Sequence, residues 1–244
     1  DLVNNIELSR NMCEKVTGFL GREHSYLATG LAHLYSKFQL DKIYMIEIDF
    51  SNMGGTNEHF KKLLAKENNI SIEDVKDYQA EALTDKAAFV VAGNILKTLK
   101  SNLHEETSII PIRSGGDELR IFFTGDIKNI AVRNLTDKLH TSIEKTTAKM
   151  GLHDHKHLKA PNNSDRNGFG AALTIKDISS INNPKNLIHE LDAEIKAWKY
   201  IIGKIRHGEI DEDFAKEEIK YFIKDGVLKP NNMPLDDFIK SEVL

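Results

Sequence analysis

The stretch Ile109–Phe123, IIPIRSGGDELRIFF, decides the fold of this chain. Two apolar runs flank the letters SGGD, and a glycine pair between β-prone runs predicts a β-hairpin. Glycine adopts a positive φ without a Cβ clash, so we expect Gly115 and Gly116 to form a tight primed turn. Asp117 and Glu118 follow, where the backbone is open enough for a phosphate or a metal ion to approach. The pattern therefore predicts a functional site at a hairpin tip.

A second strand is predicted upstream, at Lys42–Phe50, where the residues alternate at period two. Glu47 and Asp49 are two residues apart, so both carboxylates point to the same side of this strand. Two like charges held close cost free energy unless a cation or a hydrogen-bond network compensates them. The alternative is an acidic strand end that faces solvent.

Helical spacing of apolar residues predicts a helix from Asp85 to Lys100, with Thr84 or Asp85 as its N-cap. The other predicted elements are helices at about 4–38, 127–150, 187–202, 213–223 and 234–243, and a strand at 169–175.

The composition suits one sizeable domain, because the chain has 244 residues of which 40% are apolar. A formal net charge of −4 argues against a bulk nucleic-acid binder. The single cysteine, Cys13, excludes an internal disulfide and fits a reducing compartment. No apolar run is long enough to span a bilayer, so we expect a soluble, cytoplasmic domain. The chain begins at Asp1 rather than Met, which is consistent with further domains upstream.

Four stretches, in a fixed order, resemble one known family. SGGDEL, residues 114–119, resembles the signature turn of GGDEF domains, the diguanylate cyclases, with Leu119 in place of the usual Phe. EKVTGFLGR (14–22) resembles the D-x-L-T-G-L-x-N-R opening, MIEIDF (45–50) the D-I-D-x-F-K strand, and LDAEIKAWK (191–199) the A-D-x-A-L-Y-x-A-K helix. The chain is identified on this basis as a divergent member, over about residues 14–204.

The resemblance implies an α+β fold, a palm-like or ferredoxin-like antiparallel sheet of four or five strands with helices packed on it. The expected organisation is an N-terminal helical segment at 1–40, a GGDEF-like catalytic domain at 41–204 with an insertion at about 57–82, and a C-terminal helical extension at 205–244.

The resemblance also implies a metal site. Two Mg²⁺ or Mn²⁺ ions would sit over the acid cluster, one polarising an α-phosphate and the other helping to deprotonate a 3′-hydroxyl. Asp117 and Glu118 would be catalytic. The implied metal ligands are Glu47, the backbone carbonyl of Ile48, Asp49, Asp117 and Glu118.

GTP is the implied substrate, and a homodimer, at least transient, is implied because two GTP sites must face each other. Asp85 falls on the residue that reads guanine, although a simple N-cap is an equally good interpretation. The resemblance implies that Lys199 contacts the triphosphate. The alternative is that Lys199 is an exposed cation near a helix end. The remaining candidate substrate-binding residues are Asn52, Asn57, Gly115 and Gly116.

The chain departs from the family at several of these positions. Asn52 stands where a phosphate-contacting Lys is usual, Asn57 is the nearest candidate for the guanine-contacting Asn, and Gly203 stands near a missing phosphate-binding Arg. Three hypotheses follow. The first is a diguanylate cyclase that condenses two GTP into cyclic di-GMP. The second is a catalytically lapsed domain that binds a nucleotide or a protein as a regulatory module. The third is a palm-fold enzyme with a changed nucleotide or product.

Overall fold

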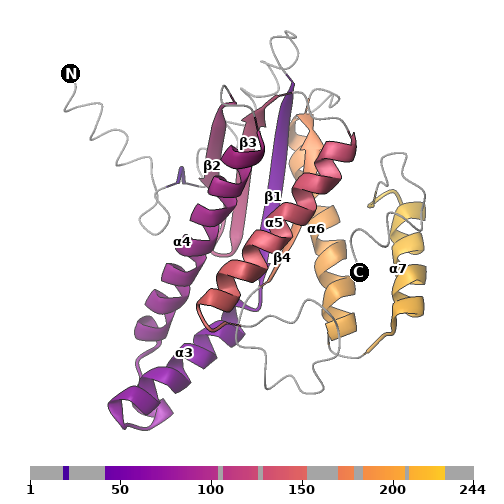
Figure 1. The fold of residues 1–244 in the computed structure, drawn as a ribbon. Helices are drawn as coiled ribbons and strands as arrows, with labels where there is room; N and C mark the ends of the chain where they lie inside the picture. The colour runs from indigo at the N-terminus through magenta and orange to yellow at the C-terminus, as the bar shows by residue number, and fades with distance from the viewer. Residues whose placement is uncertain are drawn as a thin grey trace, which may run out of the picture.

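The computed structural model describes residues 19–21, 42–103, 107–125, 129–152, 170–178, 184–206 and 209–228. Its centre is an antiparallel four-stranded sheet in the order β2-β3-β1-β4 (Figure 1). The strands are β1 Ile43–Ser51, β2 Ile109–Arg113, β3 Glu118–Thr124 and β4 Gly170–Asp177. The helices are α3 Met53–Asn68, α4 Asp77–Asn102, α5 Asn129–Lys149, α6 Pro184–Arg206 and α7 Glu212–Lys224, with a short 3₁₀ helix, η2, at Ile72–Asp74. The predicted α+β fold is confirmed.

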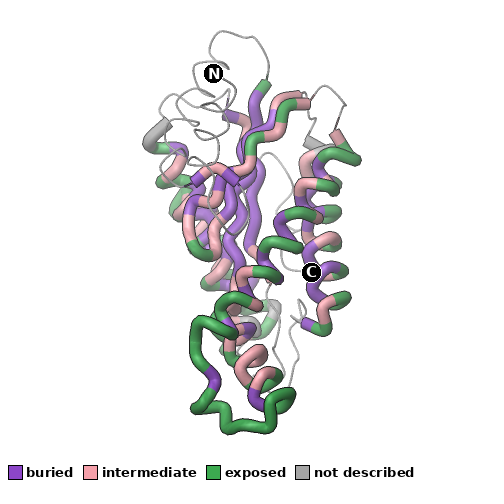
Figure 2. Tube along the Cα trace, turned by 90° about the vertical axis from the view of Figure 1, so that its left-hand side faces the viewer, coloured by how far each residue is buried: buried purple, intermediate pink, exposed green. Residues whose placement is uncertain are grey.

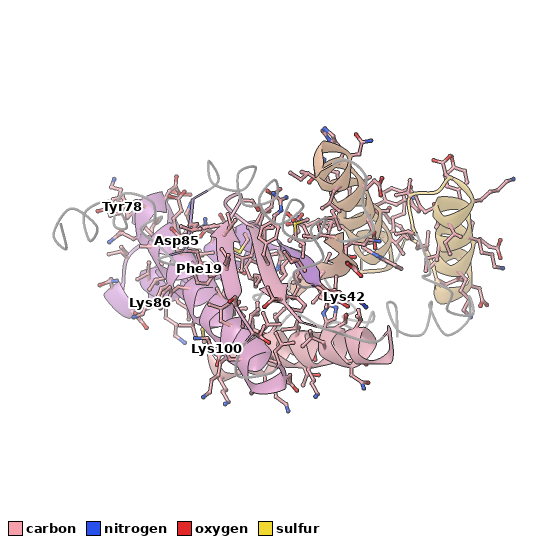
Figure 3. All side chains as sticks on the ribbon, turned by 90° about the horizontal axis from the view of Figure 1, so that it is seen from above. Phe19, Lys42, Tyr78, Asp85, Lys86 and Lys100 are labelled. Carbon is pink, nitrogen blue, oxygen red and sulfur yellow. The ribbon has the colours of Figure 1, made fainter. Side chains whose placement is uncertain are left out.

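Helices cover both faces of the sheet, which explains why β1 is buried along nearly its whole length. Alternate residues of β1, such as Ile46 and Ile48, pack with α4 and α5 in one core. The residues between them face α6, where Met45 packs with Leu187 and Leu191. Seen from above, α4 and α5 lie on one side of the sheet, and α6 and α7 lie on the other (Figure 3).

The predicted hairpin is confirmed, because β2 and β3 pair from Ile109↔Phe123 to Arg113↔Leu119. The predicted primed turn is wrong, since neither Gly115 nor Gly116 has a positive φ. The loop between the strands has four residues and closes with Ser114 N donating to Glu118 O at 3.0 Å. Loops of this length form most often on type I turns, which need no positive φ.

Gly115 is required for space rather than for backbone conformation. A Cβ at this position would lie 2.8 Å from Oε2 of Glu118. The absence of a side chain therefore lets the Glu118 carboxylate lie against the loop backbone.

The helix predicted at Asp85 begins eight residues earlier, at Asp77. The side chain of Gln79 accepts a hydrogen bond from Lys76 N at 3.1 Å, which satisfies one N–H at the true start. Thr84 instead lies inside the helix and donates to Ala80 O at 3.1 Å. The prediction that Thr84 or Asp85 caps this helix is therefore wrong.

The predicted insertion, about 57–82, consists of most of α3, η2 and the start of α4. Together these elements form a helical arm that extends beyond the end of the sheet (Figure 1). The tip of the arm is mostly exposed (Figure 2). Tyr78 and Asp85, labelled in Figure 3, mark the early turns of α4.

The C-terminal extension contributes α7, close to the helix predicted at 213–223. Ala215 and Ile219 of α7 pack with Trp198 and Ile201 of α6, in a cluster that also includes Ala172 of β4. The helix predicted at 234–243 lies outside the described residues, as does most of the N-terminal segment 1–40. From that segment, Leu20 forms a parallel bridge to Ile112 of β2.

None of the helices in the described part of the chain combines the length and the apolar character that crossing a membrane requires.

Candidate functional site

The sheet brings the predicted acids together at the end of β1. In the register of β1 and β3, Asp49 lies opposite Glu118 and Glu47 lies opposite Arg120. Phe50 N donates to Asp117 O at 2.7 Å, which ties the hairpin tip to the end of β1. Since residues opposite each other share a face, these charged side chains lie on the side of the sheet that faces α6.

Glu47 forms a buried, two-point ion pair with Arg120. Nε of Arg120 lies 2.5 Å from one carboxylate oxygen of Glu47, and Nη2 lies 2.8 Å from the other. The two side chains are only 3% and 6% exposed. Burial raises the pKa of Glu47 to about 7, although the Arg120 guanidinium opposes this shift. The alternative of an acidic strand end that faces solvent is therefore wrong for Glu47.

Sequence analysis did not single out Arg120. A signal was present, because Arg120 interrupts the apolar run LRIFF of a strand. A charged residue at such a position is buried only with a partner of opposite charge.

Lys199 of α6 reaches the end of the same acidic row. Its Nζ lies 2.5 Å from Oδ1 of Asp49 and 3.7 Å from Oδ2 of Asp117. Burial raises the pKa of Asp49 to about 6, and the hydrogen bond from Lys199 opposes this shift. Lys199 is thus held at the site by two acids.

A pocket of about 410 Å³ opens beside Lys199. Asp117 of the hairpin tip and Gly203 of α6 contribute to its lining, as do Asn52 and the first turn of α3. The pocket therefore lies where four parts of the chain meet: the end of β1 with the adjoining start of α3, the hairpin tip, β4 and α6.

The start of α3 is suited to an anion. Asn52 precedes the helix in the left-handed conformation, with φ 66°, and its side chain makes no capping hydrogen bond to the first turn. The first N–H groups of a helix lack partners within the helix and carry its positive dipole end. Gly55 is needed here, because a Cβ at that position would lie 2.3 Å from Oδ1 of Asn52. Met53, Gly54 and Gly55 of this first turn line the pocket, as does Lys199 of α6.

Arg113, which sequence analysis also missed, stabilises the hairpin tip through hydrogen bonds to its backbone. It donates from Nε to the carbonyl of Gly115 at 3.1 Å and from Nη2 to that of Gly116 at 2.7 Å. The same Nη2 lies 3.3 Å from Oδ1 of Asp85. The structure thus places Asp85 beside the hairpin tip instead of at a helix end.

Asn57 of α3 accepts a hydrogen bond of 2.5 Å from Thr84, the residue that precedes Asp85 on α4. The two candidate guanine-contacting residues, Asn57 and Asp85, therefore lie on neighbouring helices. Neither belongs to the described lining of the pocket, and their role toward guanine stays a prediction.

The acids at this site include those that the resemblance implies as ligands of two metal ions. Both oxygens of Glu47 are bound by Arg120, and Asp49 is bound by Lys199. Within the described ranges, no three His, Cys, Asp or Glu side chains are grouped so that they could hold a metal ion. As arranged here, these side chains do not fit two cations, and the ligand set Glu47, Ile48, Asp49, Asp117 and Glu118 stays a prediction.

Comparison with known proteins gives the class of this fold. No family model matches the sequence, and no curated protein matches it. Among solved structures, the GGDEF domain of DgcB from Caulobacter crescentus in complex with c-di-GMP has a TM-score of 0.50 at 12% identity, over 78% of this chain and 88% of that chain. The DgcB coiled coil and GGDEF domain, also in complex with c-di-GMP, has a TM-score of 0.52 at 12% identity, over 82% of this chain and 87% of that chain.

This chain therefore has the fold of a GGDEF domain, the class to which the diguanylate cyclases belong. At such low identity the similarity establishes the fold, and the activity has to be argued from the site itself.

Proposed function

We propose that this chain is a nucleotide-binding GGDEF-like domain whose pocket receives the phosphates of a guanine nucleotide. The observation that carries the proposal is the pocket of about 410 Å³ between Lys199 and the uncapped start of α3. A lysine ammonium and the first N–H groups of a helix are both recurrent phosphate-binding groups. GTP is the nucleotide implied by the resemblance to GGDEF domains.

In this proposal the chain acts as a regulatory nucleotide-binding module and not as an efficient enzyme. The acid that would hold catalytic metal, Glu47, is already neutralised by Arg120 inside the protein. The cationic side chain present at the pocket, Lys199, is positioned to contact a phosphate while it remains near Asp117.

The proposal is tested by calorimetric titration of the protein with GTP, ATP and pyrophosphate in the presence of Mg²⁺. We expect GTP to bind, and Lys199→Met to weaken its binding by about tenfold or more, because a charge-assisted contact is lost. Lys196→Met is the matched control, since Lys196 lies on the same helix, is 74% exposed and pairs with Asp192. Equal losses in both variants, or no nucleotide binding by the wild type, would contradict the proposal.

A second candidate function is the condensation of two GTP into cyclic di-GMP. It is favoured by Asp117, which lines the pocket at the hairpin tip, with Glu118 next to it on β3. In this reading the two acids are catalytic and two protomers meet with their pockets facing each other.

The second candidate is tested by incubating the protein with GTP and Mg²⁺ or Mn²⁺ and resolving the products by chromatography and mass. Cyclic di-GMP from the wild type but not from Asp117→Ala would establish the enzyme. Binding of GTP without any product, at protein concentrations that favour dimers, would leave the binding module as the function.

A further inference from the structure

On the side of the sheet that faces α6, cationic side chains of the protein neutralise two of the acids. Arg120 of β3 binds both carboxylate oxygens of Glu47, and Lys199 of α6 binds Asp49. Both acids are positions at which the resemblance implies contact with metal. Two of the carboxylates that were expected to bind metal ions, those of Glu47 and Asp49, are therefore bound by cationic side chains of the protein itself.

The two ion pairs differ in how easily a metal ion could replace the cation. The Arg120 and Glu47 side chains are 6% and 3% exposed, whereas Lys199 is 29% exposed. A guanidinium holds a carboxylate at two points in one plane, whereas an ammonium is a single charge on a flexible stem. Displacing Arg120 from Glu47 would leave a buried charge without a partner and next to a divalent cation, which is strongly unfavourable.

Asp117, at the hairpin tip, is held less closely by a cation than Glu47 and Asp49 are. Asp117 is 45% exposed and lies 3.7 Å from Lys199, which is closer to Asp49. Negative charge on Asp117 opposes the entry of bare phosphates into the adjoining pocket. A divalent cation that arrives with the phosphates removes this repulsion.

We propose that Arg120 is a fixed counter-ion that keeps Glu47 out of metal coordination, so that a divalent cation reaches this pocket only together with the phosphates of a bound nucleotide. Arg120 acts through Glu47 and is a positioning residue. The arrival of the cation with the phosphates rests on the proposed nucleotide-binding function, whereas the effect of Arg120 on metal binding does not.

The first test is a titration of the protein with Mn²⁺ alone at pH 8, in which electron paramagnetic resonance measures the free Mn²⁺. We expect the wild type to show no saturable, Glu47-dependent site below about 1 mM. Arg120→Met frees both oxygens of Glu47, so the variant should bind Mn²⁺ at least about tenfold more tightly than the wild type. Adding Glu47→Gln to Arg120→Met should remove this gain.

Lys176→Met is the matched control. Lys176 is another cation on this side of the sheet, 14% exposed, and its Nζ lies 2.5 Å from Oε2 of Glu194. Removing it frees one oxygen of a largely buried carboxylate outside the predicted site, while Thr174 still donates to the other at 2.8 Å, so no Mn²⁺ site should appear. A gain in Lys176→Met equal to that in Arg120→Met would overturn the assignment to Arg120.

Two further outcomes would overturn the role of Arg120: a wild-type Mn²⁺ site that Glu47→Gln abolishes, or an unchanged affinity in Arg120→Met. If Arg120→Met does not fold, Arg120→Lys replaces it, because a single ammonium cannot hold both oxygens of Glu47. The lysine variant should then gain Mn²⁺ binding, and the absence of a gain overturns the proposal.

A GTP titration, with Mg²⁺ or with EDTA, separates this inference from the proposed function. Binding with Mg²⁺ that is lost in EDTA supports the arrival of the cation with the nucleotide. Equal binding in both conditions overturns that clause. No binding in either condition overturns the proposed function, while the Mn²⁺ titration still decides the role of Arg120.

Discussion

Glu47 and Asp49 are carboxylic acids held inside the protein, and their titration couples the site to the stability of the fold. Burial raises the pKa of Glu47 from 4.5 to about 7 and that of Asp49 from 3.8 to about 6. The cations Arg120 and Lys199 reduce these shifts without cancelling them. The folded protein therefore binds protons that the unfolded chain releases at the same pH.

We expect the free energy of unfolding to fall as the pH rises from about 4.5 to 7, because a raised carboxyl pKa favours the protonated folded state. For Glu47 alone the loss across this window amounts to about 3 kcal/mol. Chemical denaturation at a series of pH values measures it. Glu47→Gln should show a flatter dependence than the wild type, and an unchanged slope would mean that Glu47 titrates normally.

Gly116 provides a test of the turn at the hairpin tip. A Cβ at Gly116 would meet no atom within 4 Å, and its φ is not positive. Gly116→Ala should therefore be neutral or stabilise the protein by about 0.4–1 kcal/mol. Gly125→Ala is the control, because Gly125 has φ 146° and its replacement should cost about 1 kcal/mol or more. Thermal unfolding measures the stability of both variants. A loss of stability in Gly116→Ala similar to that in Gly125→Ala would indicate a primed turn.

The helix α7 illustrates how an element outside the resembling region joins the structure. Its apolar side packs against α6, where Ala215 and Ile219 meet Trp198 and Ile201. The same helix α6 carries Lys199 to the pocket. By packing against α6, α7 stabilises the helix that holds Lys199, the cation proposed to contact phosphate.

We expect Ile219→Ala to lower the free energy of unfolding by about 2–5 kcal/mol, because Ile219 is fully buried and its truncation leaves a cavity. Tyr221→Ala, on the same helix but 63% exposed, should change stability by less than about 1 kcal/mol. Urea denaturation measures both variants. Similar small effects would show that α7 does not pack on α6 as described.

Taken as a whole, the molecule has apolar clusters on both sides of the sheet and a row of charged pairs on the side toward α6. The side toward α4 and α5 contains Ile46, Ile48 and their apolar neighbours. The side toward α6 contains Glu47, Asp49 and their cations, and the pocket opens at its end. The pocket proposed to bind a nucleotide therefore lies at the end of this charged row.

If two protomers share a ligand between facing pockets, the nucleotide should promote a dimer. We expect the sedimentation coefficient of the wild type to rise with protein concentration more steeply when GTP and Mg²⁺ are present. Lys199→Met, which weakens nucleotide binding, should reduce this effect. A monomer at all concentrations with bound GTP would contradict the facing-pocket arrangement and, with it, the cyclase reading.

Local periodicity was enough to predict the hairpin, the strand with Glu47 and Asp49 on one side, and the long amphipathic helices. It also indicated the order of motifs that the GGDEF fold requires. It placed the start of α4 wrongly, since the local capping at Lys76 and Gln79 was overlooked.

The tertiary structure alone decided which charges meet. Arg120 is 73 residues from Glu47 along the chain, and Lys199 is 150 residues from Asp49. Pairing between such distant residues depends on strand register and on the packing of α6, which local sequence patterns do not encode. For that reason the sequence could predict an acid cluster, while only the folded chain shows that two of its acids are neutralised by cations from within.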